Sequence, residues 1–350
     1  MSETTDSKHF SGEQVAVPKY GENAWQSSAG LYAFEGLDDP LAIHKFKLEQ
    51  GDAPSYNNYC DIDRMLQTMT HIAAAFDVNG HGKQSIALGA KHGNVCGAAY
   101  SMDPDRAIRK MIEGDETAIF GGSVMVNHEI APGDADALLR HHIKDGKRLL
   151  DIVVGASANA ETLEKLERAK GKLRVLTNPG MSRLGSISLD MTERFRYVRG
   201  GFLAQQNYTF VPNFHNAAWR AEQPLLDPGL EKDLLMAWAI GSTSTSNTIT
   251  LVKDGMLIGN GVGQQDRVSA ARLAITRAQT AGHNIRDAVA YSDSFFPFPD
   301  GPELLIEAGI RAIFTTEGSR NDELVFDTFA KGGVAVFTQP DSQARGFYGH

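Results

Sequence analysis

Two adjacent residues, Lys91 and His92, combine a fixed positive charge with a side chain that gains or loses a proton near neutral pH. The apolar run Ser85–Gly89 before them predicts a short buried strand, so we expect the pair in a loop where that strand ends. Ligands of α/β sheets bind at strand ends, and a histidine there is suited to general acid–base catalysis. A plain surface loop explains the spacing equally well, and both interpretations stand at this point.

A second candidate is the segment Ser292–Asp300, in which three phenylalanines and two prolines are flanked by carboxylates. Such a rigid apolar wall leaving a strand suits the binding of a flat heterocycle. The alternative is that the rings pack in the core.

Small polar residues form the run Thr243–Asn247, which offers hydroxyls and one amide. This run is able to orient a carboxamide or hold a monovalent cation, or it only terminates a helix. Arg267 follows Asp266, a candidate helix N-cap. Because a cation is unfavourable at a helix N-terminus, its presence indicates an anion or substrate group there, with a surface salt bridge as the alternative.

Several familiar motifs are excluded. The glycines of Gly259–Gly263 follow a predicted hairpin and lack the third glycine of a dinucleotide-binding fingerprint. No nucleotide-triphosphate P-loop occurs. The pairs His128-Glu129 and His141-His142 are not followed by the cysteine motif of zinc deaminases, so we expect no zinc and interpret these histidines as exposed residues beside helix ends.

Strands alternating with helices position these residues. The Asp-Gly turn at 254–255 predicts a hairpin, and the apolar spacing from Val268 to Ala278 predicts a helix that Gly282 ends. Further strands are predicted at Asp151–Gly155, Ala288–Tyr291, Ala312–Thr315 and Val334–Phe337, and helices at Ala158–Ala169, Pro302–Ala308 and Glu323–Phe329. This alternation predicts a layered α/β architecture with a partly parallel sheet.

Composition limits the classes of function. The chain has 350 residues and a net charge of −9, which disfavours general binding to nucleic acid or an anionic membrane. Two cysteines fit a reducing compartment. The polar first residues show no signal peptide, and the longest apolar stretch, near 234–240, is too short for a membrane span. We expect a soluble, cytoplasmic protein.

Short motifs spread over nearly the whole chain carry a family resemblance: Lys19–Asn23, Ser55–Asn58, Lys91–Gly97, Ile119–Gly122, Arg199–Gly201, Ser246-Asn247, Gly261–Arg267, Asp293–Asp300 and Gly318-Ser319. Together they resemble the aminoimidazole carboxamide ribonucleotide (AICAR) transformylase portion of the bifunctional purine-biosynthesis enzyme. The resemblance implies two cytidine-deaminase-like, three-layer α/β/α subdomains at residues 19–212 and 213–350, after a flexible arm at residues 1–18. Only that arm precedes the first motif, so we expect a stand-alone transformylase without cyclohydrolase activity, with ring closure left to another protein.

The resemblance also implies the reaction, in which a formyl group moves from 10-formyltetrahydrofolate to the 5-amine of AICAR during purine (IMP) biosynthesis. It implies that His92 is the general base, that Lys91 is the acid or electrostatic partner, and that Asn247 orients the carboxamide and the formyl oxygen. Each role fits the chemistry of its side chain.

Binding residues follow from the same resemblance. It implies AICAR contacts from Lys19, Tyr20, Gly121, Asp151, Arg267, Phe295 and Arg345. It implies folate contacts from Val268, Asp300, Ser319 and Arg320. It further implies potassium near Thr243, Ser244 and Ser246, and a homodimer whose sites are shared across the interface.

Four positions depart from the family pattern: Lys19 stands where arginine is usual, Ala24-Trp25 where proline and histidine are usual, Val95 where bacterial members have proline, and Pro299 where arginine is usual. Lysine loses the bidentate recognition of phosphate. Two alternatives therefore stand beside AICAR formylation: a formyltransferase paralogue for another amino-heterocycle, and a non-catalytic protein that binds nucleotide or folate.

Overall fold

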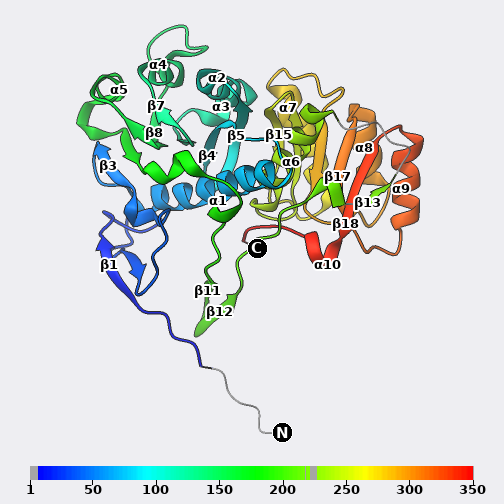
Figure 1. Ribbon diagram of the computed structural model, residues 1–350, viewed down its shortest axis with the longest axis horizontal. Helices are drawn as coiled ribbons and strands as arrows, with labels where there is room; N and C mark the ends of the chain where they lie inside the picture. Colours follow the sequence, from blue (N-terminus) through cyan, green and yellow to red (C-terminus); the bar gives the residue numbers. More distant parts are fainter. Residues whose placement is uncertain (1–6, 217, 221–226, 350) are drawn as a thin grey trace.

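One mixed sheet of twelve strands runs through both halves of the chain in the computed structural model, which describes residues 7–216, 218–220 and 227–349 (Figure 1). The strand order is β13-β18-β17-β16-β14-β15-β5-β4-β6-β8-β10-β3. The predicted α/β class is confirmed.

The first half places the edge strand β3 before a long helix and a β-hairpin, and then alternates helices with parallel strands. Its elements are β3 (Lys47–Gln50), α1 (Tyr56–Val78), β4 (Ser85–Lys91), β5 (Asn94–Ser101), α2 (Pro104–Gly114), α3 (Glu116–Ile119), β6 (Gly122–Val126), α4 (Pro132–Arg140), β8 (Leu150–Gly155), α5 (Ala160–Leu166) and β10 (Arg174–Thr177). A small parallel pair joins β7 (Glu129–Ile130) to β9 (Ser157–Ala158).

The second half repeats this sequence of elements. It contains β13 (Ala218–Arg220), α6 (Pro228–Ser242), β14 (Ile249–Lys253), β15 (Met256–Gly261), α7 (Arg267–Thr280), β16 (Val289–Ser292), α8 (Asp300–Ala308), β17 (Ala312–Glu317), α9 (Asp322–Lys331), β18 (Ala335–Pro340) and α10 (Asp341–Ala344). From the centre of the sheet outward, β15-β14-β16-β17-β18 matches β5-β4-β6-β8-β10.

The two halves join where the second strands of their hairpins meet. β15 pairs with β5 antiparallel, with Met256 opposite Ala99, and the Asn260 side chain donates to the Val95 carbonyl at 3.2 Å. An antiparallel junction places the carboxyl end of β15 beside the amino end of β5. The β4–β5 turn and the loop after β15 therefore lie at the same edge of the sheet.

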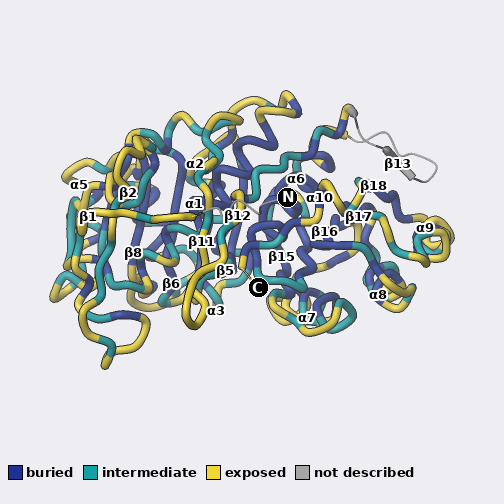
Figure 2. The backbone as a smooth tube through the Cα atoms, turned by 90° about the horizontal axis from the view of Figure 1, so that it is seen from below, coloured by how far each residue is buried: buried dark blue, intermediate teal, exposed yellow. Residues whose placement is uncertain are grey.

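Helices cover both faces of the sheet. α1 and α6 lie against one face and share a single apolar core, which includes Met69 and Trp238. On the other face, α2, α4 and α5 cover the first half, and α7, α8 and α9 cover the second. The buried trace accordingly follows the strands, while the outer helices carry the exposed positions (Figure 2).

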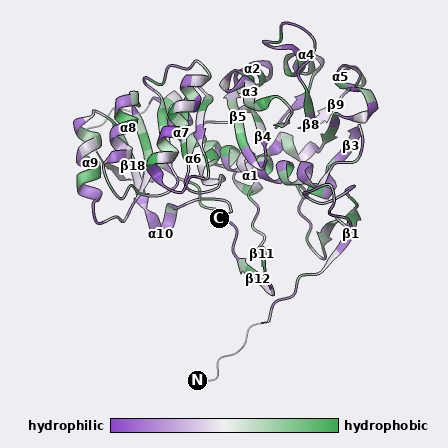
Figure 3. Ribbon diagram, turned by 180° about the vertical axis from the view of Figure 1, so that it is seen from behind, coloured by the Kyte–Doolittle hydropathy of each residue, from purple (hydrophilic) through white to green (hydrophobic). Residues whose placement is uncertain are grey.

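Two short antiparallel pairs lie outside this sheet. β1 (Gly12–Ala16) pairs with β2 (Leu31–Phe34), so part of the segment predicted to be a loose arm is a strand. β11 (Arg194–Val198) pairs with β12 (Gly201–Gln205), and this β11–β12 hairpin projects from the body (Figures 1 and 3). Phe10, next to β1, packs its ring 4.3 Å from that of Phe195 in the hairpin.

Most predicted elements of the second half are present within a few residues of their expected ends. In the first half, strand β5 was missed, and the helix predicted at 158–169 covers only Ala160–Leu166. None of the helices within the described ranges has both the length and the apolar character needed to span a membrane. The subdomain boundary between residues 212 and 213 stays a prediction.

Candidate functional site

His92 lies in a two-residue hairpin turn rather than in an open loop. Its φ of 54° and that of Gly93, 68°, allow the tight turn between β4 and β5, and the His92 side chain is exposed. Asp61 of α1 supports the turn, because its carboxylate accepts from the Gly93 N–H at 2.9 Å and from the Ser123 hydroxyl of β6 at 2.8 Å. The turn holds an exposed imidazole on a braced backbone.

Lys91 and Gly121 lie beside this turn, and a third predicted residue, Asp151, lies on β8, two strands from β4. The Lys91 ammonium donates to the Phe120 carbonyl at 2.7 Å and lies next to Gly121, whose backbone has a φ of 75°. Asp151 is exposed at the start of β8, and its carboxylate is 3.9 Å from the guanidinium of Arg168. We call Lys91, His92, Gly121 and Asp151 the first-half cluster.

A pocket of about 480 Å³ opens at the junction of the two halves. Lys91 and His92 line it from one side, and Thr245, Gly263 and Arg277 line it from the other. The Arg277 guanidinium lies 3.9 Å from the Asp115 carboxylate, which also lines the pocket. The exposed imidazole therefore faces a cavity bordered by the second half.

Four predicted residues gather in a second pocket, of about 510 Å³: Asn247, Arg267, Phe295 and Arg345. We call them the second-half cluster. The Arg345 guanidinium lies 5.6 Å from the centre of the Phe295 ring, and it also pairs with Asp341 at 2.7 Å. Thr245 lines the first pocket and Ser246 the second, so neighbouring residues of this run border both pockets.

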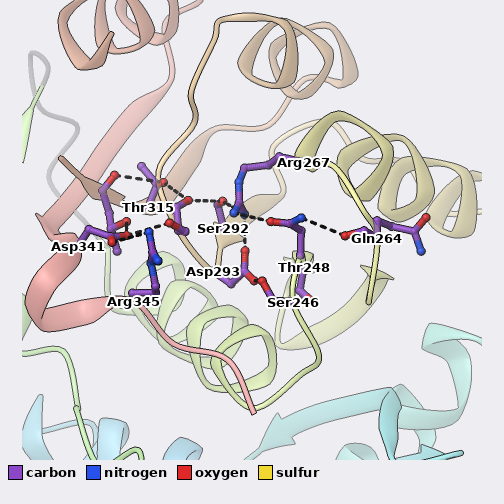
Figure 4. Close-up of polar contacts among 12 residues, drawn as sticks. Ser246, Thr248, Gln264, Arg267, Ser292, Asp293, Thr315, Asp341 and Arg345 are labelled. Atoms are coloured by element: carbon purple, nitrogen blue, oxygen red, sulfur yellow. Dashed lines mark hydrogen bonds and ion pairs between the residues drawn. The ribbon is translucent and has the colours of Figure 1, made fainter. Parts of the chain in front are cut away.

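Arg267 is held by a buried network (Figure 4). Its guanidinium pairs with Asp293, donates to the Ser292 hydroxyl at 3.0 Å and donates to the Asn247 side-chain oxygen at 2.7 Å. The Asp293 side chain is fully buried and accepts a further bond from Ser246 at 2.6 Å. The anion predicted beside Arg267 is thus a carboxylate of the protein, in a buried ion pair rather than a surface one.

The three phenylalanine rings of the segment Ser292–Asp300 have different surroundings. Phe295 lines the second pocket, whereas Phe296 is buried against Phe329 with ring centres 5.9 Å apart. Phe298 is largely exposed. One phenylalanine therefore faces the pocket, and the expectation of a wall of three is wrong.

The residues predicted to contact folate belong to the same region of the sheet edge. Val268 is in the first turn of α7, Asp300 begins α8, and Ser319 and Arg320 lie in the loop between β17 and α9. The Asn321 amide of that loop donates to the Pro297 carbonyl at 2.7 Å, and Pro297 lines the second pocket. These loops follow the carboxyl ends of β16 and β17, the usual place for a ligand.

Lys19 and Tyr20 lie apart from the second pocket. Their loop contacts the first turn of α1, where the Asn57 amide donates to the Glu22 carbonyl at 3.2 Å. Lys19 is exposed, and neither residue lines either of the two pockets described above. Within one chain, the predicted AICAR contacts are therefore divided between two places.

The hydroxyls predicted near potassium all have protein acceptors. Thr243 donates to the Ala239 carbonyl at 2.7 Å and Ser244 to the Ile240 carbonyl at 2.7 Å, whereas Ser246 donates to Asp293. The Thr243 carbonyl accepts from the Arg64 guanidinium. These hydroxyls are therefore engaged as donors within the protein, and no step below involves the ion. Dependence on potassium stays a prediction.

Histidine and glutamate side chains form one cluster with metal-ligand spacing within the described residues: Glu113, His141 and His142, with ligand atoms within 4.8 Å of one another. Arg109 lies 3.0 Å from His141 Nδ1, and a guanidinium only donates. The His141 proton is therefore on Nε2, facing Glu113 at 2.7 Å. A metal-bound histidine instead donates its other N–H to an acceptor, so this cluster does not fit a metal as arranged.

Two supporting carboxylates were missed by the sequence analysis as partners of the site. Asp61 has no local signature, because it braces the His92 turn from a helix that precedes it by a whole strand. Asp293 belongs to the aromatic segment that was singled out, but its pairing with Arg267 depends on how β16 and α7 meet. Its position directly after an apolar strand was the available indication.

Comparisons with known proteins identify one family. The family model for the AICARFT/IMPCHase bienzyme matches residues 1–277. The bifunctional purine biosynthesis proteins PurH of Mycobacterium marinum and Mycobacterium ulcerans are each 36% identical over 327 residues, which is 92% of this chain and 56% of theirs. The chain thus spans about half the length of these relatives.

One solved structure, a diaminohydroxyphosphoribosylaminopyrimidine deaminase/5-amino-6-(5-phosphoribosylamino)uracil reductase of Thermotoga maritima, matches 28% of this chain and 31% of its own at 24% identity. Its TM-score of 0.21 is too low to bear on fold or chemistry. The family model and the two PurH proteins are sufficient: this chain belongs to the AICARFT/IMPCHase bienzyme family.

Proposed function

We propose that this protein is an AICAR transformylase, which transfers the formyl group of 10-formyltetrahydrofolate to the 5-amine of AICAR in purine biosynthesis. The observation that carries the proposal is that the predicted residues line two pockets at one edge of the sheet, Lys91 and His92 in the first and Asn247, Arg267, Phe295 and Arg345 in the second. Membership in the bienzyme family supports the same reaction.

The reaction exchanges one C–N bond for another. The AICAR amine attacks the formyl carbon, and His92 accepts the amine proton as that bond forms. The tetrahedral oxyanion then collapses, the bond to the folate nitrogen breaks, and that nitrogen takes up a proton to give tetrahydrofolate. Because the amine is conjugated with the imidazole, it is a weak nucleophile, and removal of its proton during attack is the step that most needs help.

The second-half cluster supplies orientation and charge. The Asn247 amide is fixed at both ends, because its oxygen accepts from Arg267 at 2.7 Å and its nitrogen donates to the Gln264 carbonyl at 3.0 Å. It keeps one N–H and one lone pair for the substrate carboxamide and the developing oxyanion. Arg345 lines the same pocket beside Phe295, which suits a phosphate next to a heterocycle.

Complete sites formed between two copies of the chain explain the separation of the clusters. Six strand spacings separate β8, which carries Asp151, from β16, which precedes Phe295. At about 4.8 Å each, this is roughly 29 Å, much more than one nucleotide spans. We therefore propose a homodimer in which the first-half cluster of one subunit meets the second-half cluster of its partner.

The β11–β12 hairpin supplies a surface for this dimer. It projects from the body (Figure 3), and its cross-strand partners Tyr197 and Phe202, which share one face of the hairpin, are 76% and 43% exposed in the single chain. Monomeric proteins seldom expose such apolar residues together on a projecting element. Burial of these side chains against a second copy, related by a twofold axis, removes the free-energy cost of exposing them to water.

Turnover by the purified protein tests the reaction. Supplied with AICAR and 10-formyltetrahydrofolate, the protein is expected to release tetrahydrofolate, and a panel of other amino-heterocycles is expected to react far more slowly. Binding of AICAR without turnover of any amine would contradict the proposal and favour a binding protein. Preferential turnover of another amine would favour the paralogue.

Mixed subunits test the shared site. His92→Ala and Arg345→Ala are each expected to be nearly inactive at low AICAR concentration as homodimers. In a purified heterodimer of the two, one of the two sites contains neither substitution, so activity should return. A verified heterodimer that stays inactive would place each site within one chain.

A further inference from the structure

The last residues of the chain fold back onto the second pocket. The Gly346 N–H donates to the Asp293 carbonyl at 3.3 Å, and the Tyr348 N–H donates to the Ser244 carbonyl at 2.9 Å. Arg345, which lines the pocket, lies directly before these two anchors. Arg345 is therefore held from two sides, by Asp341 of α10 before it and by the segment anchored through Gly346 and Tyr348 after it.

Tyr348 is held by three charged side chains from two distant parts of the sequence. The guanidinium carbon of Arg64 lies 4.3 Å from the centre of its ring, and that of Arg194 lies 3.5 Å from it. The Tyr348 hydroxyl donates to the Asp63 carboxylate at 3.2 Å. The ring is almost fully buried, so these cation–π contacts act with little competition from water.

The two positive charges of this cluster lie next to one carboxylate and one aromatic ring, which offset their repulsion. Asp63 and Arg64 are neighbours on α1, and Arg194 begins strand β11 of the projecting hairpin. Two guanidinium groups near one another repel unless an anion and an electron-rich ring lie between them, and Asp63 and Tyr348 supply these. Without the ring, the Arg194 guanidinium loses its closest described partner in this cluster, and the hairpin loses a link to α1.

The cluster connects to the reaction pocket by short steps. Arg64 also donates to the Thr243 carbonyl, and the Thr243 and Thr68 hydroxyls are 2.6 Å apart. Thr243 begins the run that ends in Asn247, and Ser246 of that run bonds to Asp293. The Tyr348 cluster thus holds both ends of the second-half cluster, through Arg345 on one side and the run to Asn247 on the other.

We propose that Tyr348 is a positioning residue of the AICAR pocket, which through Arg64, Arg194 and Asp63 fixes Arg345 and Asn247 without touching the substrate. This inference rests on the proposed function for the identity of the ligand. It adds that the end of the chain is part of the site, and that the hairpin and the pocket are anchored at one point.

Substitution of Tyr348 is expected to affect binding more than chemistry. In Tyr348→Ala, the KM for AICAR should rise roughly tenfold, which corresponds to the loss of desolvated cation–π contacts, while kcat changes less. Tyr348→Phe keeps the ring but leaves the Asp63 carboxylate without this donor, and should raise KM by less than Tyr348→Ala does. Arg194→Met should raise KM by an intermediate factor. Tyr32→Ala, which removes an exposed tyrosine outside the cluster, is the matched control.

Hydrogen exchange provides a second readout that does not depend on the reaction. Backbone amides at 244–248 and 346–348 should exchange faster in Tyr348→Ala than in the wild type, and should keep their rates in Tyr32→Ala. Unchanged exchange together with an unchanged KM would overturn the proposal while leaving the transformylase reaction intact. If the wild type shows no turnover, the proposed function fails, and the exchange rates alone decide whether Tyr348 positions these segments.

Discussion

The two halves of this protein share one arrangement of elements but contribute opposite ends of it to the site. In the first half, the edge carries the hairpin turn of β4 and β5 and the amino ends of β6 and β8. In the second half, the same edge carries the carboxyl ends of β16, β17 and β18, and the hairpin turn lies at the far side. The antiparallel junction of β5 and β15 causes this reversal.

This reversal separates two kinds of chemistry. A tight turn holds few side chains but exposes them, which suits the proton transfer that we propose for His92. Loops at carboxyl ends, together with the start of α7, surround a pocket, which suits binding and orientation. Repetition of a fold therefore need not repeat a site, because the way the copies join decides which end each presents.

The largest expected effect is on the free energy of unfolding, when the residues that support the two clusters are replaced. Arg267→Met leaves the fully buried Asp293 carboxylate without its cation and should lower the free energy of unfolding by about 3–5 kcal/mol. Asp61→Ala, at the half-buried brace of the His92 turn, should cost about 1–2 kcal/mol. Urea denaturation of both variants measures the difference. A larger loss in Asp61→Ala would reverse the comparison.

A group at the junction itself should give a pH signature. Asp233 of α6 accepts from the Tyr100 hydroxyl at 2.7 Å and from the Gly255 N–H at 2.8 Å, which joins β5 to the turn of the other hairpin. Burial raises the pKa of this carboxyl from 3.8 to about 6. Because the folded state holds the proton more tightly, stability from this group falls as pH rises from about 4 to about 6.

Asp233→Asn keeps the accepting oxygen and removes the charge. The free energy of unfolding of the variant, relative to that of the wild type, should therefore increase by about 3 kcal/mol between pH 4 and pH 7. Denaturation curves at a series of pH values measure this difference. A difference that does not vary with pH would show that Asp233 does not titrate as its surroundings imply.

The smallest effect compares equivalent glycines on the second strands of the two hairpins. A Cβ at Gly259 would lie 2.3 Å from the Ala274 carbonyl oxygen, and one at Gly97 would lie 2.7 Å from that of Met111. Each alanine variant should lose about 1–3 kcal/mol, and Gly259→Ala should lose more. Thermal unfolding checks the order. Equal losses would mean that α2 and α7 pack against their strands with the same tolerance.

Local patterns were sufficient for much of the second half. The Asp-Gly turn, the Asp266 cap and the apolar strands each have a signature within a few residues, and the structure has the corresponding elements. In the first half, β5 was missed because Asn94–Ser101 mixes small and polar residues, and its strand character comes from pairing with β4 and β15. The sequence of a single segment does not specify which strands it pairs with.

The sequence indicated which residues belong to the site, but it did not indicate how they are arranged. The aromatic segment and Arg267 were singled out, but burial divided the rings, and Asp293 proved to be the partner of Arg267. The junction that brings His92 near the second half is made by strands far apart in the sequence. Such long-range pairing follows from the whole fold, and no motif spacing could have specified it.

We propose that His92 of the first half accepts the proton and that Arg345 of the second half binds the nucleotide. Steady-state kinetics of His92→Ala and Arg345→Ala, measured side by side with AICAR varied, test this most directly. His92→Ala should lower kcat by about 10²- to 10⁴-fold with little change in KM, and Arg345→Ala should raise KM while much of kcat remains. A His92→Ala enzyme with normal kcat, or an Arg345→Ala enzyme with unchanged KM, would contradict the account.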